Sequence, residues 1–279
     1  MTDRKKEKVI MARNEKLRAI GVGFSCVDVY EKLDKYYPTG NGVDWAVHLQ
    51  RMEVQTSILS VVGTDIYGEK MKEALKKEGI DISYLHTKEG ETCKMLMDLK
   101  DGVDRVHLEE IEGVMKDFAL TKEDKDYICQ YPYMHTDLFG NVLGDLEELH
   151  NAGVKVVMDF SAFSEDPEFC RDEYFSWVDY AFLSCEKEDD HVISHLQKIK
   201  SYGPKTVTAT FGDKGSLCYD GERFYRHGIV ETKVVNTVGA GDSYIAGFTY
   251  GIMNGWDIPA CMKKGAEVSA GVVAKFEPY

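Results

Sequence analysis

Short apolar runs rich in β-branched residues alternate with longer helical patterns along most of this chain. The runs LRAIGVGF (17–24) and QTSILSVVG (55–63) are continuous apolar stretches, typical of strands that are buried on both faces. The helical segment VDWAVHLQRME (43–53) separates them, and YGEKMKEALKKEG (67–79) follows the second run. Further strands are expected at 131–140, 152–162, 178–185 and 204–212. This alternation predicts an α/β fold with a mostly parallel sheet covered by helices.

Two stretches break this rhythm. VDVYEKLDKYYP (27–38) follows the first strand at once, and the stretch 91–113 alternates around the turn signal Asp101-Gly102. We expect both to form antiparallel strands that project from the main sheet as a small lid. Such a lid would close over a substrate, or it would pair with the lid of a second subunit. A plain edge hairpin gives the same periodicity, so the sequence leaves these alternatives open.

Composition limits the function classes. We expect a charged extension at 1–16 and a single domain over 17–279, because no linker divides the chain. No long apolar run predicts a membrane span, and the formal charge of −14 argues against nucleic acid or an anionic membrane as a partner. Seven dispersed cysteines without a CxxC pair favour a cytoplasmic protein.

His191 and His195 have metal-ligand spacing but no third ligand nearby, so a solvated helix face is the expected interpretation.

In an open parallel sheet, ligands bind outside the carboxyl ends of the strands. Asp137 and Asp159 follow two of the expected strands directly. Carboxylates at this edge suit sugar hydroxyls or a magnesium–phosphate complex, although acids at strand ends also commonly cap turns.

The segment Gly239-Ala240-Gly241-Asp242 opens an apolar helical pattern. Glycines let a ligand approach the unpaired N–H groups of a helix N-terminus, where the helix dipole favours an anion. A transferring phosphoryl group is such an anion, and Asp242 could accept a proton from the attacking hydroxyl. Taken alone, the same four residues also fit a simple helix cap formed by Asp242 or Ser243. The P-loop and protein-kinase motifs are absent from the sequence.

Six segments in order resemble the motifs of the ribokinase-like, phosphofructokinase-B type carbohydrate kinases. They are GVGFSCVD, TGNGVDWA, VVGTDIYGE, CEKE, TFGDKG and NTVGAGD, and they lie between residue 21 and residue 242. The resemblance implies a three-layer α/β/α fold with a small β-strand lid, and an enzyme that uses ATP and Mg²⁺.

The resemblance also implies roles for particular residues. The sugar substrate would contact Asp28, Gly40, Asn41 and Asp44. The nucleotide would contact Cys185, Thr210, Gly212 and Gly215, and Glu188 would reach the metal through water. Asp242 would be the catalytic base, and the amides of Gly239, Ala240 and Gly241 would form the anion hole.

Three local phrases resemble one branch of this family, the bacterial fructoselysine 6-kinases. They are CVDVYEKLDKYYPTGN, GIDISYLHTKEG and EGVMKDFALTKED. The implied reaction transfers the γ-phosphoryl group of ATP to the 6-hydroxyl of a glycated amino acid. A ketose or nucleoside kinase of the same family is an alternative, and a sugar-binding sensor with a decayed kinase site is a further one.

The sequence departs from the family pattern at three positions. Asn236 stands where the last motif usually has an aspartate, Cys185 replaces an asparagine, and Asp44 replaces another. Asn236 and the short C-terminal end put a monovalent cation in doubt. Asp44 either binds an amine or hydroxyl of the substrate or is a solvated helix acid. The resemblance allows a homodimer through the lid, and the sequence leaves a monomer open.

Overall fold

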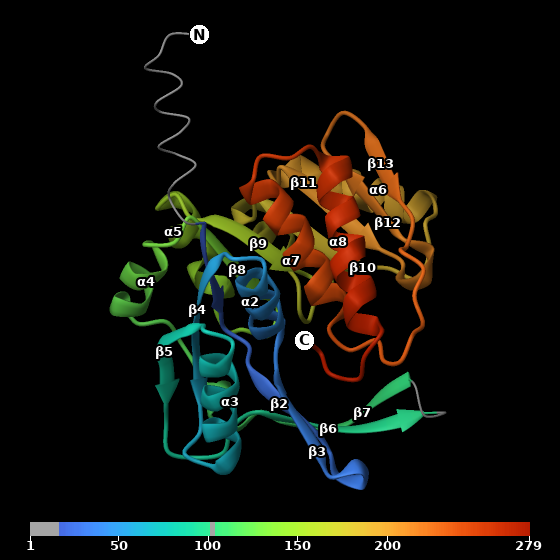
Figure 1. Cartoon of the computed structure of the whole chain (residues 1–279). Helices are drawn as coiled ribbons and strands as arrows, with labels where there is room; N and C mark the ends of the chain where they lie inside the picture. The colour runs from blue at the N-terminus through green and yellow to red at the C-terminus, as the bar shows by residue number, and fades with distance from the viewer. Residues whose placement is uncertain (1–16, 101–103) are drawn as a thin grey trace, which may run out of the picture.

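The computed structural model describes residues 17–100 and 104–279, so the expected extension at 1–16 and the expected turn at Asp101-Gly102 lie outside the described residues. Within these ranges the chain forms a nine-stranded sheet and a separate four-stranded sheet (Figure 1).

The large sheet has the strand order β13-β12-β11-β10-β9-β8-β1-β4-β5. All neighbouring pairs from β11 to β5 are parallel, and antiparallel pairing is confined to β12 and β13 at one edge. The strands are β1 Arg18–Val22, β4 Gln55–Val62, β5 Asp81–Thr87, β8 Tyr133–Asp137, β9 Lys155–Asp159, β10 Tyr180–Ser184, β11 Thr206–Thr210, β12 Ser216–Tyr219 and β13 Phe224–His227. The central strands are buried on both faces, as their continuous apolar runs predict.

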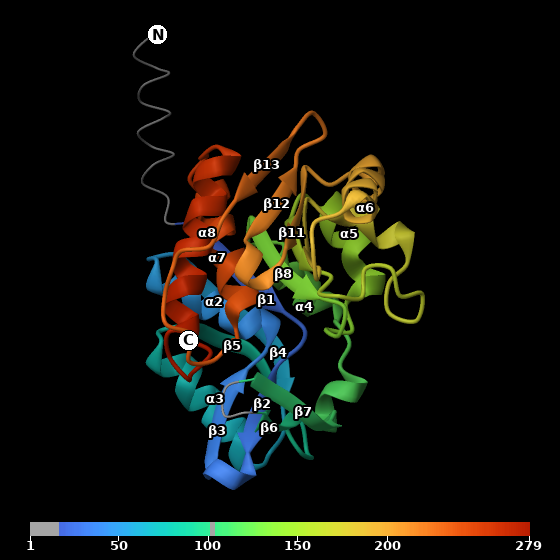
Figure 2. The ribbon, with the colours of Figure 1, turned by 90° about the vertical axis from the view of Figure 1, so that its right-hand side faces the viewer.

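Helices cover both faces of this sheet. One apolar cluster includes side chains of α4, α5 and α6, and the other includes side chains of α2, α3, α7 and α8. Figure 2 shows these two helix layers with the sheet between them. The helices are α2 Asn41–Arg51, α3 Ile66–Lys77, α4 Lys122–Ile128, α5 Leu146–Asn151, α6 Asp190–Tyr202, α7 Ala240–Met253 and α8 Ile258–Val273. Short 3-10 helices are η1 Glu31–Leu33, η2 Gly113–Asp117, η3 Leu143–Asp145, η4 Asp172–Trp177 and η5 Gly212–Lys214. The predicted three-layer α/β/α fold is confirmed.

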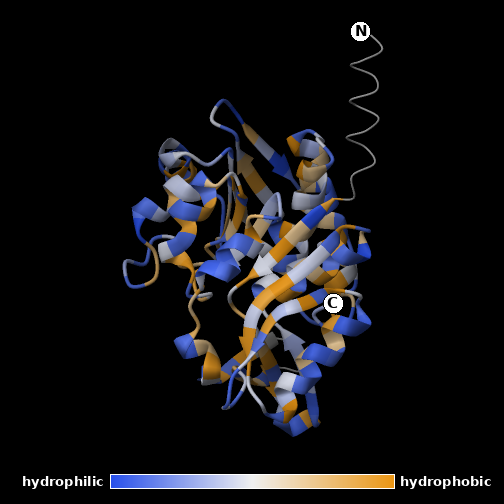
Figure 3. Ribbon diagram, turned by 90° about the vertical axis from the view of Figure 1, so that its left-hand side faces the viewer, coloured by the Kyte–Doolittle hydropathy of each residue, from blue (hydrophilic) through white to orange (hydrophobic). Residues whose placement is uncertain are grey.

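Local chemistry explains where several helices begin. The side chain of Asp65 accepts a hydrogen bond from the Gly68 amide and caps α3. Asp257 caps α8 in the same way, and Pro259 follows in the first turn, where its missing N–H costs nothing. Figure 3 shows how apolar residues concentrate on the strands while hydrophilic residues dominate the outer loops and helix turns.

The small sheet has the order β3-β2-β6-β7, with β2 Cys26–Tyr30, β3 Lys35–Thr39, β6 Lys94–Lys100 and β7 Asp104–Ile111. β2–β3 and β6–β7 are antiparallel as expected, but β2 and β6 pair in parallel, because each enters the lid from the large sheet in the same direction. Asp65 fixes the base of the lid by accepting hydrogen bonds from the amide and hydroxyl of Thr92. The lid therefore stands directly beyond the ends of β1 and β4 (Figure 1).

The C-terminal segment lies against α2 and the end of β3. The hydroxyl of Tyr279 donates to the carbonyl of Pro38 at 2.7 Å, and the ring of His48 contacts the carbonyl of Pro278 at 3.3 Å. Burial lowers the pKa of His48 to about 4, so this ring is neutral at neutral pH. Among the described residues, no helix is both long and apolar enough to cross a membrane.

Candidate active site

The N-terminus of α7 is a bare helix end. Gly239 is the N-cap residue with φ 71°, and as a glycine it brings no side chain to cap the first turn. The N-cap position therefore falls on Gly239, and the alternative that places Asp242 or Ser243 at the N-cap is wrong. No atom lies within 4 Å of the place where a Cβ on Gly241 would stand, so the backbone is open to a ligand there. Asp242 lies in this first turn and is partly buried. The turn combines open backbone, the positive end of a helix dipole and a carboxylate.

Asp44 lies beside this helix end. A Cβ on Gly239 would stand 3.3 Å from Oδ2 of Asp44 and 2.7 Å from the carbonyl of Pro278. Asp44 is only 1% exposed and accepts a hydrogen bond from the hydroxyl of Thr39 at 2.8–2.9 Å. The alternative of a solvated helix acid is therefore wrong, because the first turn of α2 turns Asp44 inward toward α7.

Gly40 and Asn41 form the start of α2. Gly40 is the N-cap with φ 134°, and a Cβ there would stand 2.7 Å from the carbonyl of Phe24, so only glycine allows this close approach. The side-chain amide of Asn41 donates to Asp159 at 3.1 Å. These contacts hold the start of α2 against the carboxyl end of β9 and the loop that follows β1.

Asp137 and Asp159 are neighbours across β8 and β9, at the carboxyl ends of both strands. Burial, and to a smaller extent the charge of nearby Asp159, raise the pKa of Asp137 to about 7. A hydrogen bond from the Phe139 amide acts in the opposite direction and lowers this pKa. Burial likewise raises the pKa of Asp159 to about 6. Oδ2 of Asp137 is buried without a hydrogen-bond partner among the described residues. Asp159 does cap the turn to Ser161, and it also binds Asn41.

The predicted nucleotide residues lie together at the ends of β10 and β11 and in the turn into β12. Thr210 ends β11, and its carbonyl accepts a hydrogen bond from the amide of Cys185, which follows β10. Gly212 and Gly215 bound the short turn into β12 with φ 58° and 92°, a conformation that favours glycine. No atom lies within 4 Å of a Cβ placed on Gly212, so this backbone is open. Burial raises the pKa of the Cys185 thiol and keeps it protonated.

A hydrogen bond connects this turn to α7. The hydroxyl of Tyr244 donates to Ser216, directly after Gly215, at 2.8 Å. The glycine turn and the bare helix end are thereby held in a fixed relation.

Glu188 is partly exposed and forms an ion pair with Arg226 of β13 (Nε to Oε1, 2.8 Å). Sequence reasoning missed Arg226, because an arginine on an edge strand carries no local signal of its role. The pair places the guanidinium of Arg226 beside Glu188, the acid that was expected to reach the metal.

Asp28 lies on β2, within the lid, and is buried. The thiol of Cys26 is hydrogen-bonded to Cys93 and buried, and the charges of both Asp28 and Asp44 raise the pKa of that thiol further. Asp28 and Asp44 therefore both lie near Cys26. The structure places the predicted sugar residues Asn41 and Asp44 on α2, and Asp28 on β2 of the lid.

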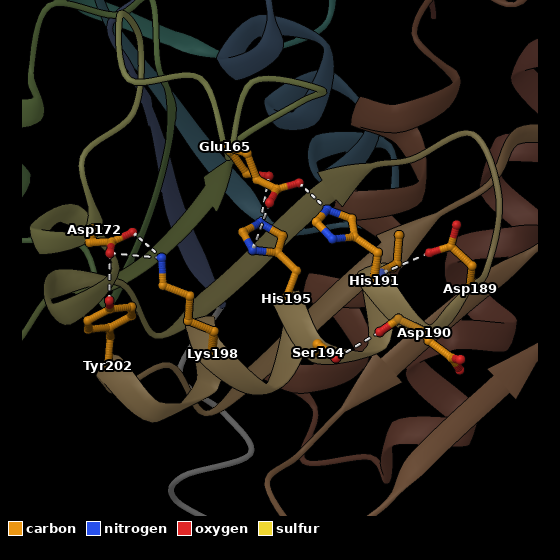
Figure 4. A network of polar contacts seen from close by, with 11 residues as sticks. Glu165, Asp172, Asp189, Asp190, His191, Ser194, His195, Lys198 and Tyr202 are labelled. Carbon is orange, nitrogen blue, oxygen red and sulfur yellow. Dashed lines mark hydrogen bonds and ion pairs between the residues drawn. The ribbon is translucent and has the colours of Figure 1, made fainter.

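His191 and His195 face a side chain that the sequence did not predict. Glu165 contacts Nε2 of His191 at 2.8 Å and Nδ1 of His195 at 3.8 Å (Figure 4). The expected solvated helix face is correct for His191, which is exposed, and wrong for His195, which is 8% exposed and bonded to Ser164. Within the described ranges, no group of three or more His, Cys, Asp or Glu side chains has the geometry of a metal site.

Comparisons with known proteins identify the family of the chain. The model of the pfkB family carbohydrate kinases matches residues 14–137 and 178–279. The chain is 37% identical over 252 residues to a fructoselysine 6-kinase of Shigella flexneri, covering 90% of this chain and 95% of that protein. It is 30% identical over 258 residues to a fructosamine kinase of Bacillus subtilis, with 91% and 90% covered.

Solved structures share the fold. An adenosine kinase of Sinorhizobium meliloti superposes with a TM-score of 0.80 at 19% identity, covering 95% of this chain and 96% of the other. The Arabidopsis thaliana ribokinase in complex with ribose and ATP superposes with a TM-score of 0.78 at 18% identity, with 93% of each chain covered. From the family model and the identity to these relatives, the chain belongs to the pfkB family of carbohydrate kinases.

Proposed function

We propose that this protein is an ATP-dependent kinase that phosphorylates the 6-hydroxyl of a glycated amino acid such as fructoselysine. The observation that carries the proposal is the glycine start of α7, where Gly239 lies against Asp44 and the open backbone of Gly241 lies beside Asp242. The similarity to a fructoselysine 6-kinase and a fructosamine kinase supports the choice of substrate class.

In the proposed reaction, Asn41 and Asp44 hold sugar hydroxyls from α2, and Asp28 approaches from the lid. Asp242 accepts the proton of the attacking 6-hydroxyl as its oxygen bonds to the γ-phosphorus of ATP and the bond to the ADP oxygen breaks. The amides of Gly239 and Gly241 donate toward the oxygens on which negative charge develops, and the Ala240 amide, which donates to the Thr237 carbonyl at 3.3 Å in this structure, would turn toward them as well. Asp44, buried beside Gly239, orients the sugar relative to that helix end.

The residues present fit a nucleotide. Gly212 and Gly241 leave open backbone on either side of the Tyr244–Ser216 hydrogen bond, and Cys185, Thr210 and Gly215 border the same region. Lys214 and Arg226 add positive charge there. This cradle would take the phosphates of ATP.

Mg²⁺ usually keeps several waters and binds substrate phosphates with one or two carboxylates. The described residues contain no three-ligand cluster, and Glu188 is a carboxylate at this edge, so they fit a metal of this kind. When bound, Mg²⁺ would neutralise phosphate charge, and Glu188 would hold it through water.

Asn236 supports an enzyme without a monovalent cation. Its side-chain amide donates to the carbonyl of Phe276 at 2.9 Å, and its Oδ1 accepts from the amide of Val238 at 3.1 Å. Asn236 is 1% exposed, so this amide joins the C-terminal segment to the loop before α7 from inside the protein. The N–H group then makes the contact to a carbonyl oxygen that a cation would make.

The lid supports a homodimer as a second proposal. Leu33, Tyr36 and Leu108 expose apolar surface on the lid strands and their connection. Sedimentation equilibrium would show a dimer that Leu108→Lys dissociates, whereas a monomer at all concentrations would overturn this assembly.

Seven free cysteines without a disulfide support a reducing, cytoplasmic location.

A coupled ADP-release assay tests the function. The panel contains fructoselysine, fructose and adenosine, with Mg²⁺ and ATP. Turnover with fructoselysine at the highest kcat/KM is expected. Preference for fructose or adenosine would favour a ketose or nucleoside kinase, and ligand binding without ADP release would favour a sugar sensor.

A further inference from the structure

A cavity lies between the lid and the loop after β8. It has a volume of about 210 Å³, more than the roughly 150 Å³ that accommodates a benzene ring in an engineered cavity. One wall is formed by the last strand of the lid and the segment that follows it. This wall contains Glu110 near the end of β7, Glu112, and Lys116 of η2. The other wall is aromatic and includes Phe139 and Phe169.

The cavity adjoins the proposed sugar site. Phe24 lines it, and the carbonyl of Phe24 is the atom against which Gly40 packs at the start of α2. Phe139 also lines it, and its amide donates to Asp137, the neighbour of Asp159. A substrate bound at Asn41 therefore has this cavity next to it.

The two walls are joined and shaped by direct contacts. The side-chain amide of Asn141 donates to the carbonyl of Met115 at 3.0 Å, which ties the loop after β8 to η2. Phe139 packs edge-on against Phe169 with ring centroids 5.8 Å apart, and against Phe24 at 6.2 Å. An aromatic wall of this kind suits an alkyl chain or a cation.

The charges in the cavity are mixed and have no internal partners. Glu110, Glu112 and Lys116 form no ion pair with any described residue. Burial and the charge of Glu112 raise the pKa of Glu110, which shows that the two carboxylates share one environment. Two acids and one base around an apolar wall match a ligand that carries ammonium groups, a carboxylate and an alkyl chain.

Two of the three phenylalanines that line the cavity belong to the part of the chain that the family model does not match. That model covers 14–137 and 178–279, whereas Phe139 and Phe169 lie between these ranges. A feature of this segment is therefore suited to substrate choice within the family and not to the shared phosphoryl transfer.

We propose that this cavity is the subsite for the amino-acid part of the substrate, with Glu110 and Glu112 binding ammonium groups, Lys116 binding the α-carboxylate and the phenylalanines packing on the alkyl chain. The proposal rests on the proposed function. It states which residues make a glycated lysine a better substrate than a glycated amine.

Three substrates separate these contacts. Fructoselysine has the full head group, fructosyl-cadaverine lacks the carboxylate, and fructosyl-pentylamine lacks both the carboxylate and the terminal ammonium. For the wild type we expect kcat/KM to fall about tenfold at each of the two steps, the change that follows from about 1.4 kcal/mol per contact.

Variants assign the contacts. In Glu110→Gln/Glu112→Gln, the preference for fructosyl-cadaverine over fructosyl-pentylamine should fall about tenfold, mainly through KM. In Lys116→Met, the preference for fructoselysine over fructosyl-cadaverine should fall instead. Glu109→Gln is the matched control, because neighbouring strand residues point to opposite faces, and it should keep the wild-type ratios.

The outcomes distinguish the two proposals. If the wild type phosphorylates all three compounds and the cavity variants keep the wild-type ratios, the subsite is wrong and the proposed function stands. If the wild type phosphorylates none of them, the proposed function is wrong and the subsite falls with it.

Discussion

The side-chain amide of Asn41 donates a 3.1 Å hydrogen bond to the carboxylate of Asp159, joining residues 118 positions apart in the sequence. This bond fixes the first turn of α2 to the carboxyl end of β9. Asp159 in turn lies beside Asp137, so one predicted sugar-binding residue connects to a pair of buried carboxyl groups.

The buried carboxyl of Asp137 predicts a pH-dependent stability. Its pKa of about 7 exceeds the ordinary 3.8, so the folded protein keeps a proton that the unfolded chain loses between about pH 4 and pH 7. The free energy of unfolding should therefore fall as the pH rises through this window. Asp137→Asn should stabilise the protein by about 2–4 kcal/mol at pH 8 and have little effect at pH 4. Urea unfolding at both pH values measures this, with the exposed Glu147→Gln as control. Equal effects of Asp137→Asn at both pH values would contradict a raised pKa.

Asp242→Asn tests the catalytic base. The change keeps the shape of the side chain and removes its ability to accept the proton, so kcat should fall by about a hundredfold or more with a modest change in KM. Steady-state kinetics with fructoselysine and ATP measures both constants. The exposed Glu267→Gln on α8 should leave them as in the wild type. Near wild-type turnover in Asp242→Asn would show that Asp242 is not the catalytic base.

Gly239 and Gly255 provide a matched pair, because both have φ 71°. A Cβ on Gly255 meets no atom within 4 Å, whereas one on Gly239 would stand 2.7 Å from the Pro278 carbonyl and 3.3 Å from Asp44. Gly255→Ala should cost only the backbone strain, about 1–2 kcal/mol. Gly239→Ala should cost more and should also lower kcat by about tenfold or more, because the start of α7 must shift. Thermal unfolding and kcat measured on both variants test this, and equal behaviour would contradict it.

Asn236 predicts independence from monovalent cations. Wild-type turnover should be the same with K⁺ or with tetramethylammonium as the monovalent cation. Asn236→Asp loses the donor to Phe276 and sets a carboxylate against a carbonyl, so it should destabilise the protein by about 1–3 kcal/mol, and K⁺ should recover part of this loss.

Asn254→Asp is the control for that variant. Asn254 makes the same amide-to-carbonyl bond, to Tyr250, at an exposed helix end. It should cost less and should not respond to K⁺. Wild-type turnover that requires K⁺ would overturn the role given to Asn236.

Glu165 should control the titration of His191. The carboxylate of Glu165 holds the pKa of His191 above its ordinary value by accepting a hydrogen bond from it (Figure 4). A raised histidine pKa stabilises the fold below about pH 6.5, and this contribution is lost as the pH rises through the pKa of the folded protein. NMR titration should show that the pKa of His191 falls in Glu165→Gln. It should stay at the wild-type value in Glu168→Gln, which changes a neighbouring exposed acid. An unchanged His191 pKa in Glu165→Gln would refute the contact in solution.

The sequence by itself determined the fold class and predicted the glycine-rich start of α7. Strand burial and helix starts depend on residues close together in the chain, so the runs at β1, β4 and β9 and the glycines before α7 could be predicted locally. The family could also be predicted from the sequence, because each of its motifs is a short segment and the motifs occur in the family's order.

The tertiary structure decided which side chains meet. The burial of Asp44, the bond from Asn41 to Asp159 and the contact of Glu165 with His191 join segments that no local pattern connects. Tyr279 reaches Pro38 across 241 positions, and this contact sets the C-terminal carbonyls beside Gly239. The pKa values of Asp137 and Asp159 follow from their burial side by side, which exists only once β8 and β9 have paired. A side chain's ionisation and partners depend on what surrounds it in space, and only the folded chain fixes those surroundings.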